Sequence, residues 1–196
     1  MSFRPVAAVA LAATLAMPLA GCGINSIPTA EENAKARWAD VQNDYQRRAD
    51  LIPNLVSTVR AAGAQEKDIL VQVTQARAAA TQVKVSGDEL TDPAKVQAFE
   101  RAQAGVTLSL QRLQEAYPEL KSQGNYTTLM SQLEGTENRI AIARRDYNGA
   151  VQGYNTTIRT FPAAIGARIF YGAKPMTPFQ ATTPGAETAP KVDFGS

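Results

Sequence analysis

Residues 126–161, with the sequence YTTLMSQLEGTENRIAIARRDYNGAVQGYNTTIRTF, decide the fold class of this chain. Alternating steps of three and four residues connect one mostly apolar face along the whole stretch, a period typical of helices packed almost parallel or antiparallel. The members of this face are Tyr126, Met130, Leu133, Glu137, Ile140, Arg144, Tyr147, Val151, Tyr154, Ile158 and Phe161. The stretch therefore predicts one long helix of an all-α bundle.

The same period runs through the chain before this stretch, from Trp38 to Val83 and again in a second segment. The members of the second segment are Val96, Phe99, Gln103, Val106, Leu110, Leu113 and Tyr117. Asp92-Pro93 is an N-cap followed by proline at the first helical position, and Pro118 ends the helix before it. We therefore predict an antiparallel up-and-down helical bundle.

The number of helices depends on Pro53. The apolar period keeps its phase through this proline, which is consistent with three helices, the first running from Glu31 to Lys84 with a kink at Pro53. Packing favours four long helices, because the segment 94–117 covers only half of such a helix. If the chain reverses near Arg47–Asp50, Asp50 caps a new helix and every apolar stripe is covered. We favour four helices and keep three as the alternative.

The composition excludes several kinds of site. The 196 residues include no histidine and one cysteine, which excludes Ser-His-Asp and Cys-His nucleophiles, histidine-ligated zinc and an intrachain disulfide. The formal net charge of +2 argues against a broad nucleic-acid surface. We therefore expect no metal, no cofactor and no nucleic-acid partner.

The N-terminus predicts export. Arg4 is the only charge before Glu31, and residues 6–20 are apolar apart from Thr14, which is the pattern of a signal peptide. This stretch is shorter than the about 20 residues that a spanning helix needs. Leu19-Ala20-Gly21-Cys22 resembles a bacterial lipobox, which implies cleavage before Cys22 and lipidation of its thiol. We expect a lipoprotein on the periplasmic side, and Gly23 after the cysteine favours the outer membrane.

The domain organisation follows from these signals. The last part of the chain is rich in proline and threonine and has no apolar period, so it is predicted to be disordered. The predicted segments are a signal peptide at 1–21, an anchor linker at 22–28, a helical bundle at 29–171 and a disordered tail at 172–196.

Motifs along residues 23–171 resemble those of the LemA family. They are Gly23-Ile24-Asn25, QRRADLIPNLV at 46–56, Ala76-Arg77, AYPELK at 116–121, LEGTEN at 133–138, Ala143-Arg144, Tyr147-Asn148, Tyr154-Asn155 and Phe161-Pro162. The resemblance implies a membrane-tethered helical bundle that faces outward from the cytoplasm, with no settled biochemical activity. Members of the family usually have an N-terminal transmembrane helix, and a lipobox stands in its place here.

Five polar side chains occupy positions that the period assigns to the core. Buried charges in bundles usually pair with one another and set the register of the helices, because unpaired burial costs several kcal/mol. We expect partners on neighbouring helices, and a polar binding site inside the bundle is the functional alternative. The five are Arg48, Glu66, Gln103, Glu137 and Arg144.

The four-helix arrangement also predicts a polar tip. The turns at 47–53 and 118–124 would fall at the same end of the bundle, away from Cys22. A cationic cluster with an aromatic ring and an amide suits an anionic ligand or an acidic partner surface. The alternative is that these residues only cap helices and face solvent. The tip would contain Arg47, Arg48, Asp50, Asn54, Tyr117 and Lys121.

The leading functional hypothesis is a non-enzymatic, lipid-anchored scaffold or interaction module of the cell envelope, with a protein partner or a second copy on its helical faces. The rival is an envelope glycan hydrolase that uses Glu66 and Glu137, which requires two carboxylates about 5–9 Å apart in a cleft. Remodelling of a lipid surface requires a basic or amphipathic face, which the balanced net charge does not indicate.

Overall fold

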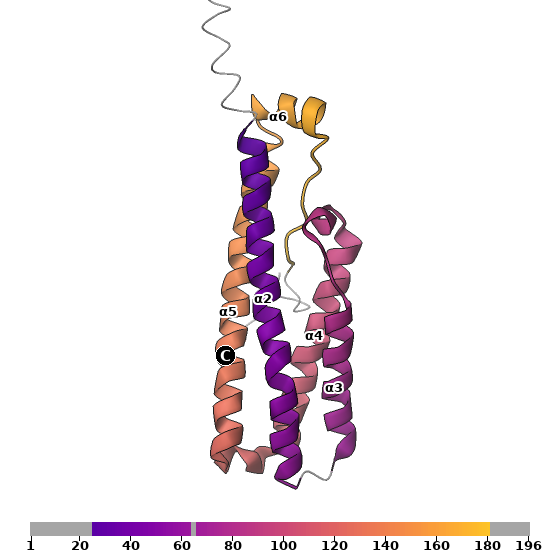
Figure 1. The fold of residues 1–196 in the computed structure, drawn as a ribbon, viewed down its shortest axis with the longest axis vertical. Coiled ribbons are helices and arrows are strands. Elements are labelled where there is room, and N and C mark those ends of the chain that lie inside the picture. Colours follow the sequence, from indigo (N-terminus) through magenta and orange to yellow (C-terminus); the bar gives the residue numbers. More distant parts are fainter. Residues whose placement is uncertain (1–24, 64–65, 181–196) are drawn as a thin grey trace, which may run out of the picture. The chain divides into compact units, whose positions relative to one another are not determined.

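The computed structural model describes residues 25–63 and 66–180. It contains four long helices, α2 (Ser26–Ala61), α3 (Lys67–Gln82), α4 (Pro93–Ala116) and α5 (Gly124–Thr157). Short helical segments follow three of them: η1 (Gly87–Thr91), η2 (Pro118–Ser122), α6 (Ala163–Gly166) and η3 (Ala167–Tyr171). No strand occurs within these two described ranges. The predicted all-α helical bundle is confirmed (Figure 1).

The first turn of the bundle lies later than predicted. The chain does not reverse at Arg47–Asp50, because α2 is continuous through Pro53 to Ala61. Gly63 follows with φ of 86°, a left-handed conformation that glycine adopts without strain. The three-helix alternative is also wrong, because no single helix reaches Lys84. Four long helices form, with the break near Gly63.

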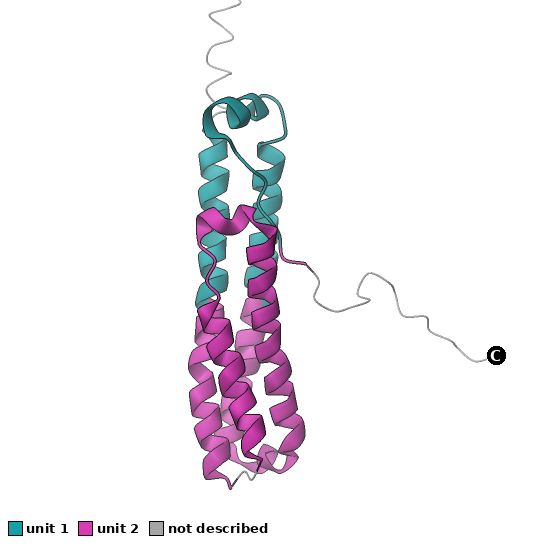
Figure 2. Ribbon diagram, turned by 90° about the vertical axis from the view of Figure 1, so that its right-hand side faces the viewer, with its two compact units in different colours: residues 1–43, 141–178 teal, residues 44–140, 179–196 magenta. Residues whose placement is uncertain are grey.

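The chain divides into two compact units (Figure 2). Unit 1 contains residues 1–43 and 141–178, and unit 2 contains residues 44–140 and 179–196. The helices α2 and α5 each contribute one part to unit 1 and the other part to unit 2.

In unit 2 the second part of α2, then α3, α4 and the first part of α5 follow one another up and down (Figure 1). All seven predicted members of the apolar face in α4 and at its C-cap are buried, from Val96 to Tyr117. Asp92 caps α4 by accepting a hydrogen bond from the Ala94 N–H at 2.9 Å, as predicted. Tyr117, at the C-cap of α4, joins that end of the helix to the start of α3. Its hydroxyl donates to the Glu66 carbonyl and accepts from the Glu66 N–H.

In unit 1 the first part of α2 packs against the second part of α5. The rings of Trp38 and Tyr147 lie 5.3 Å apart between their centroids, and both side chains are buried. α2 begins at Ser26, inside the stretch predicted as a linker. At that same end, α6 and η3 lie beside the start of α2 (Figures 1 and 2).

Residues 172–178, which we call the strap, belong to no helix or strand. They were predicted to belong to a disordered tail, yet they are fastened to α5. Asn155 donates from Nδ2 to the Met176 carbonyl at 2.9 Å and accepts from the Met176 N–H at 2.8 Å. The Tyr147 hydroxyl donates to the Thr177 carbonyl at 2.9 Å. Side-chain bonds to the backbone order this segment although its own sequence has no apolar period.

Candidate functional site

A buried cation lies at the centre of unit 2. Arg48 is 2% exposed, and its guanidinium donates to Glu137 Oε1 at 2.7 Å and to Gln103 Oε1 at 2.7 Å. It also donates to the Gln103 carbonyl and the Thr107 hydroxyl, and it stacks on the Tyr45 ring at 4.9 Å. One side chain of α2 thus holds α4 and α5 together, which is the pairing expected for a buried charge in a bundle.

The other four polar residues that the period assigned to the core differ from one another in exposure. Gln103 is buried, whereas the Glu137 side chain is 39% exposed and therefore keeps water on its outer side. Arg144 is partly buried, and Glu66 is exposed just before α3. The Glu66 side chain is exposed because the chain turns there instead of continuing the helix. Thr107, which the period did not single out, completes the Arg48 contacts.

The predicted tip does not assemble, because it depends on a turn that the chain does not make. Arg47, Asp50 and Asn54 are exposed positions within α2, and Asp50 accepts a hydrogen bond from Gln46 on its own helix. Arg48 points into the core, as described above. Tyr117 and Lys121 lie at the turn between α4 and α5. Residues of α2 near Ala61 and Ala62, not those near Arg47, share a pocket with that turn.

The rival carboxylate pair does not form either. Glu66 lies in the turn between α2 and α3, just before α3 begins. Glu137 lies well inside α5, where it pairs with Arg48. Of these two carboxylates, only Glu137 lines the groove of unit 2 described next.

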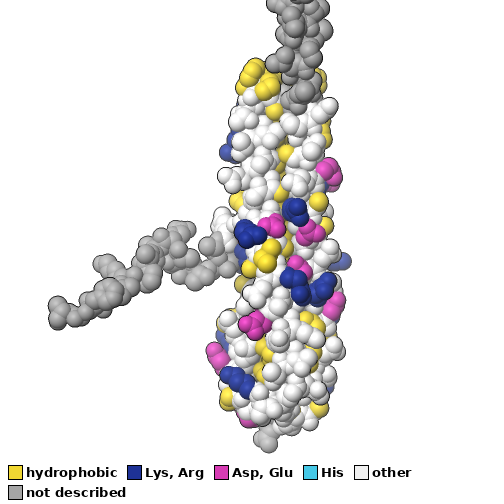
Figure 3. All heavy atoms as spheres, turned by 90° about the vertical axis from the view of Figure 1, so that its left-hand side faces the viewer, with side chains coloured by type: hydrophobic (Ala, Val, Ile, Leu, Met, Phe, Trp, Pro, Cys, Tyr) yellow, Lys and Arg dark blue, Asp and Glu magenta, His cyan; other side chains and the backbone are white. Residues whose placement is uncertain are grey.

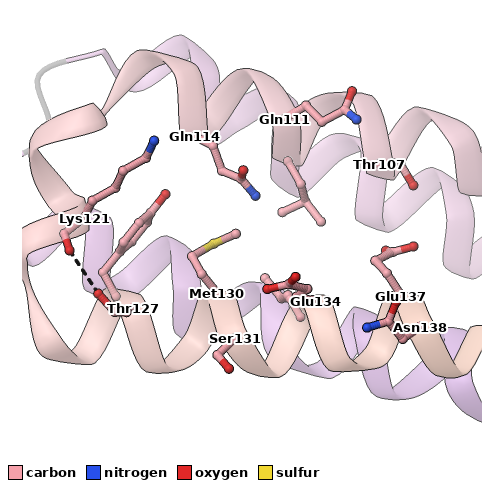
Figure 4. Close-up of a pocket in the computed structure, with 13 residues that line it drawn as sticks. Thr107, Gln111, Gln114, Lys121, Thr127, Met130, Ser131, Glu134, Glu137 and Asn138 are labelled. Atoms are coloured by element: carbon pink, nitrogen blue, oxygen red, sulfur yellow. Dashed lines mark hydrogen bonds between the residues drawn. The ribbon is translucent and has the colours of Figure 1, made fainter.

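This groove lies between α4 and α5 and has a volume of about 720 Å³. In Figure 4, Thr107 and Gln114 point toward it from α4, and Met130, Glu134 and Glu137 of α5 face them from the other side. Apolar side chains line it together with polar ones, and the charges differ along its length. Lys121 lines one end, beside the turn, and Glu134 and Glu137 line the part farther along α5. The apolar members are Leu110, Tyr126, Met130 and Leu133.

Tyr126 is the unusual member of this groove. Its side chain is 2% exposed, and its hydroxyl makes no hydrogen bond to any described residue. Burial, with a smaller contribution from Glu119, raises the pKa of the Tyr126 hydroxyl, so it remains a proton donor at neutral pH. A buried hydroxyl without a partner is costly.

A second surface feature lies at the end of unit 1. Large apolar side chains of residues 161–171 are exposed there, and Figure 3 shows hydrophobic atoms gathered at that end. Basic residues accompany them, whereas residues 147–180 contain no aspartate or glutamate. The exposed basic residues are Arg159, Arg168 and Lys174. We call the apolar group the end patch; it consists of Phe161, Ile165, Ile169, Phe170 and Tyr171, with exposures between 44% and 82%.

Cys22, the predicted lipid attachment residue, lies outside the described residues. Within the part of the chain that the structure describes, no group of His, Cys, Asp and Glu side chains is arranged to hold a metal ion. No helix in the same part combines the length and the apolar character needed to cross a membrane.

A family profile and several relatives match this chain. The LemA family profile matches residues 37–194, which is more than half of the chain. Magnetosome proteins MamQ 2 and MamQ 1 of Paramagnetospirillum magneticum are each 28% identical over 181 residues, covering 83% of this chain and 65% of the relative. Magnetosome protein MamQ of Magnetospirillum gryphiswaldense is 27% identical over 157 residues, covering 70% of this chain and 58% of the relative. The chain therefore spans less than two thirds of the length of these relatives.

Proposed function

The chain belongs to the LemA family, and we propose that it is an envelope protein held at a membrane surface by the end of unit 1, where it acts as a scaffold or protein-interaction module. The observation that carries this proposal is the end patch. Monomeric proteins rarely expose a contiguous group of large apolar side chains without a binding role. A lipid surface is the occupant that its chemistry fits best.

Two features support a lipid surface rather than a protein partner. The patch is apolar, with Ile165 and Ile169 one helical turn apart, as in helices that lie in the membrane interface. Its neighbours Arg159, Arg168 and Lys174 are basic, and each basic residue near an anionic lipid surface contributes about 1 kcal/mol. The chain's overall charge of +2 concealed these basic residues, because the 18 acidic residues all lie outside residues 147–180, Glu31 and Glu32 near the start of α2 among them.

The position of the patch also agrees with a lipid on Cys22. α2 begins at Ser26, only four residues after Cys22, and the patch lies at the same end of unit 1. A lipid anchor and an apolar patch at one end would act together. This matters because stable membrane binding usually requires two signals.

The scaffold role rests on what the rest of the chain offers. The long helices present extended faces, and the buried Arg48 contacts set their register rather than forming a reaction centre. The MamQ relatives are named after the magnetosome and not after a reaction. A structural or interaction role is therefore better supported than an enzymatic one.

The test is performed in intact cells with the full chain. Mass spectrometry of the N-terminus should find a mature chain that begins with lipidated Cys22, and Cys22→Ser should lower the membrane-bound fraction without abolishing it, because the end patch still contacts the lipid. Cross-linking should then recover a protein partner with the wild-type chain. An unmodified, uncleaved N-terminus would exclude the lipid anchor, and recovery of no protein partner would count against the scaffold.

A further inference from the structure

The groove between α4 and α5 has an apolar floor, charges of both signs and a buried hydroxyl donor without an acceptor. Tyr126 supplies that donor, and Met130 and Leu133 lie in the floor near it. An extended peptide with one large apolar side chain and charges of both signs would suit this groove. Its apolar side chain would cover the floor, and its charged side chains would pair with the charges along the groove.

The chain itself leads toward this groove. Phe179 is buried in unit 2, and the Gln180 N–H donates to Glu100 Oε1 on α4 at 3.0 Å. Glu100, Thr107 and Gln114 follow one another at intervals of seven, so they share one face of α4. Thr107, at the near end of the groove, is about 10 Å from Glu100 along the helix axis. The last described residue of the chain is thus attached to the helix face that continues into the groove.

We propose that residues 190–194, Pro-Lys-Val-Asp-Phe, bind in this groove and cover it. The order of charges fits: Lys191 would face Glu134, Phe194 would cover the floor at Met130, and Asp193 would lie toward Lys121. Glu134 is exposed on α5 and has no ion-pair partner among the described residues, so it is available to Lys191.

The length of chain after Gln180 and the extent of the family match both support residues 190–194 as the segment that binds in the groove. Lys191 is eleven residues beyond Gln180, and an extended chain of that length spans about 36 Å. This exceeds the distance from Glu100 to the far end of α4, about 24 Å. The LemA family profile also continues to residue 194, so it includes the proposed binding segment.

The proposal is tested by placing a benzophenone amino acid at Phe194 in the full chain and mapping the photo-cross-link by mass spectrometry. We expect an intramolecular link to the peptide that contains Met130 and Leu133. The same probe at Thr183 is the matched control and should not give this link. Links to other surfaces, or links only between copies at a yield that rises with protein concentration, would overturn the proposal.

Charge reversal tests the expected direction of binding. Glu134→Lys and Lys191→Glu should each lower the yield of the Phe194 link at least fivefold, and the double variant should restore most of it. Equal yields in all four proteins would contradict the pairing. As an independent measurement, a chain that ends after Gln180 should oxidise at Met130 several times faster with hydrogen peroxide, while buried Met176 should not change. An unchanged Met130 rate would mean that nothing covers the groove.

Discussion

Arg77 donates from Nε to the carbonyl oxygen of Ala49 at 2.7 Å. Ala49 precedes Pro53 by four residues, and proline has no N–H to bond that carbonyl within the helix. An arginine of α3 therefore provides the hydrogen bond that α2 lacks at its internal proline. The same contact joins α3 to α2 in unit 2.

Arg77→Leu should lower the free energy of unfolding by about 1–2 kcal/mol, because it leaves the Ala49 carbonyl without its donor. In a Pro53→Ala background the alanine N–H bonds that carbonyl, so the same Arg77 change should cost less. Urea unfolding followed by circular dichroism measures both values. Arg112→Leu is the control, since Arg112 makes only a 3.5 Å exposed contact with Gln72. Equal costs of Arg77→Leu in the two backgrounds would show that the bond to Ala49 does not compensate for the proline.

The same proline explains which part of the fold the sequence predicts and which it does not. The apolar period predicts the α4 face completely, because every member from Val96 to Tyr117 is buried. It fails at the first turn, where the period continues through Ala62 and Glu66 although the helix has ended. Pro53 is a strong local signal for a helix start. It stands inside α2 because Arg77, distant in sequence, donates the hydrogen bond that the Ala49 carbonyl would otherwise lack. Gly63 was the available signal for the true turn.

Arg48→Met should destabilise unit 2 by about 3 kcal/mol, because it leaves Gln103 and Glu137 without their shared cation in a mostly buried place. Glu137→Gln should cost at most about 1 kcal/mol, since the Glu137 side chain is 39% exposed and an amide still accepts the hydrogen bond. Denaturant unfolding is the measurement, and Arg47→Met, at the exposed neighbouring position, is the control. Similar midpoints for Arg48→Met and Arg47→Met would contradict the role assigned to Arg48.

Asn155→Ala should release the strap from α5, because it removes both hydrogen bonds to Met176. We expect the Met176 amide to exchange at least tenfold faster with deuterium, in keeping with about 1–2 kcal/mol for two hydrogen bonds. Gln152→Ala, at an exposed position of the same helix, should leave that rate unchanged. Unchanged protection of Met176 in Asn155→Ala would mean that other contacts hold the strap.

Glu89 predicts a specific acid response. A hydrogen bond from Lys95 and a second from the Ser86 N–H lower the pKa of the Glu89 carboxyl from its ordinary value of 4.5 to about 2. A lowered pKa gives stability that is complete above the unfolded value and is lost as the pH falls from about 4.5 toward 2. Glu89→Gln should therefore flatten the decline in unfolding temperature over this range, by a small amount because the group is exposed. Identical slopes in the two proteins would contradict the assignment.

The candidate site was less predictable than the fold for a physical reason. The buried Arg48 could be found because its position follows from the helical period. The end patch could not, because Phe161 was assigned to the core by the same period, whereas it is 82% exposed. The helix α5 ends at Thr157, so the face that the period follows is interrupted before Phe161. The strap was missed because its order comes from Asn155 and Tyr147, not from its own residues.

The most direct test of the membrane-facing end is binding of the predicted mature chain, residues 22–196 carrying Cys22→Ser, to vesicles that contain anionic lipid, measured by flotation. Ile169→Glu with Phe170→Glu should lower the bound fraction more than tenfold, because each large apolar side chain buried in lipid contributes about 1.5–3 kcal/mol. Val71→Glu with Leu108→Glu, two positions with 49% exposure in unit 2, should bind as the unmodified protein does. Equal binding by the end-patch variant and this control would contradict the claim that the end of unit 1 faces the membrane.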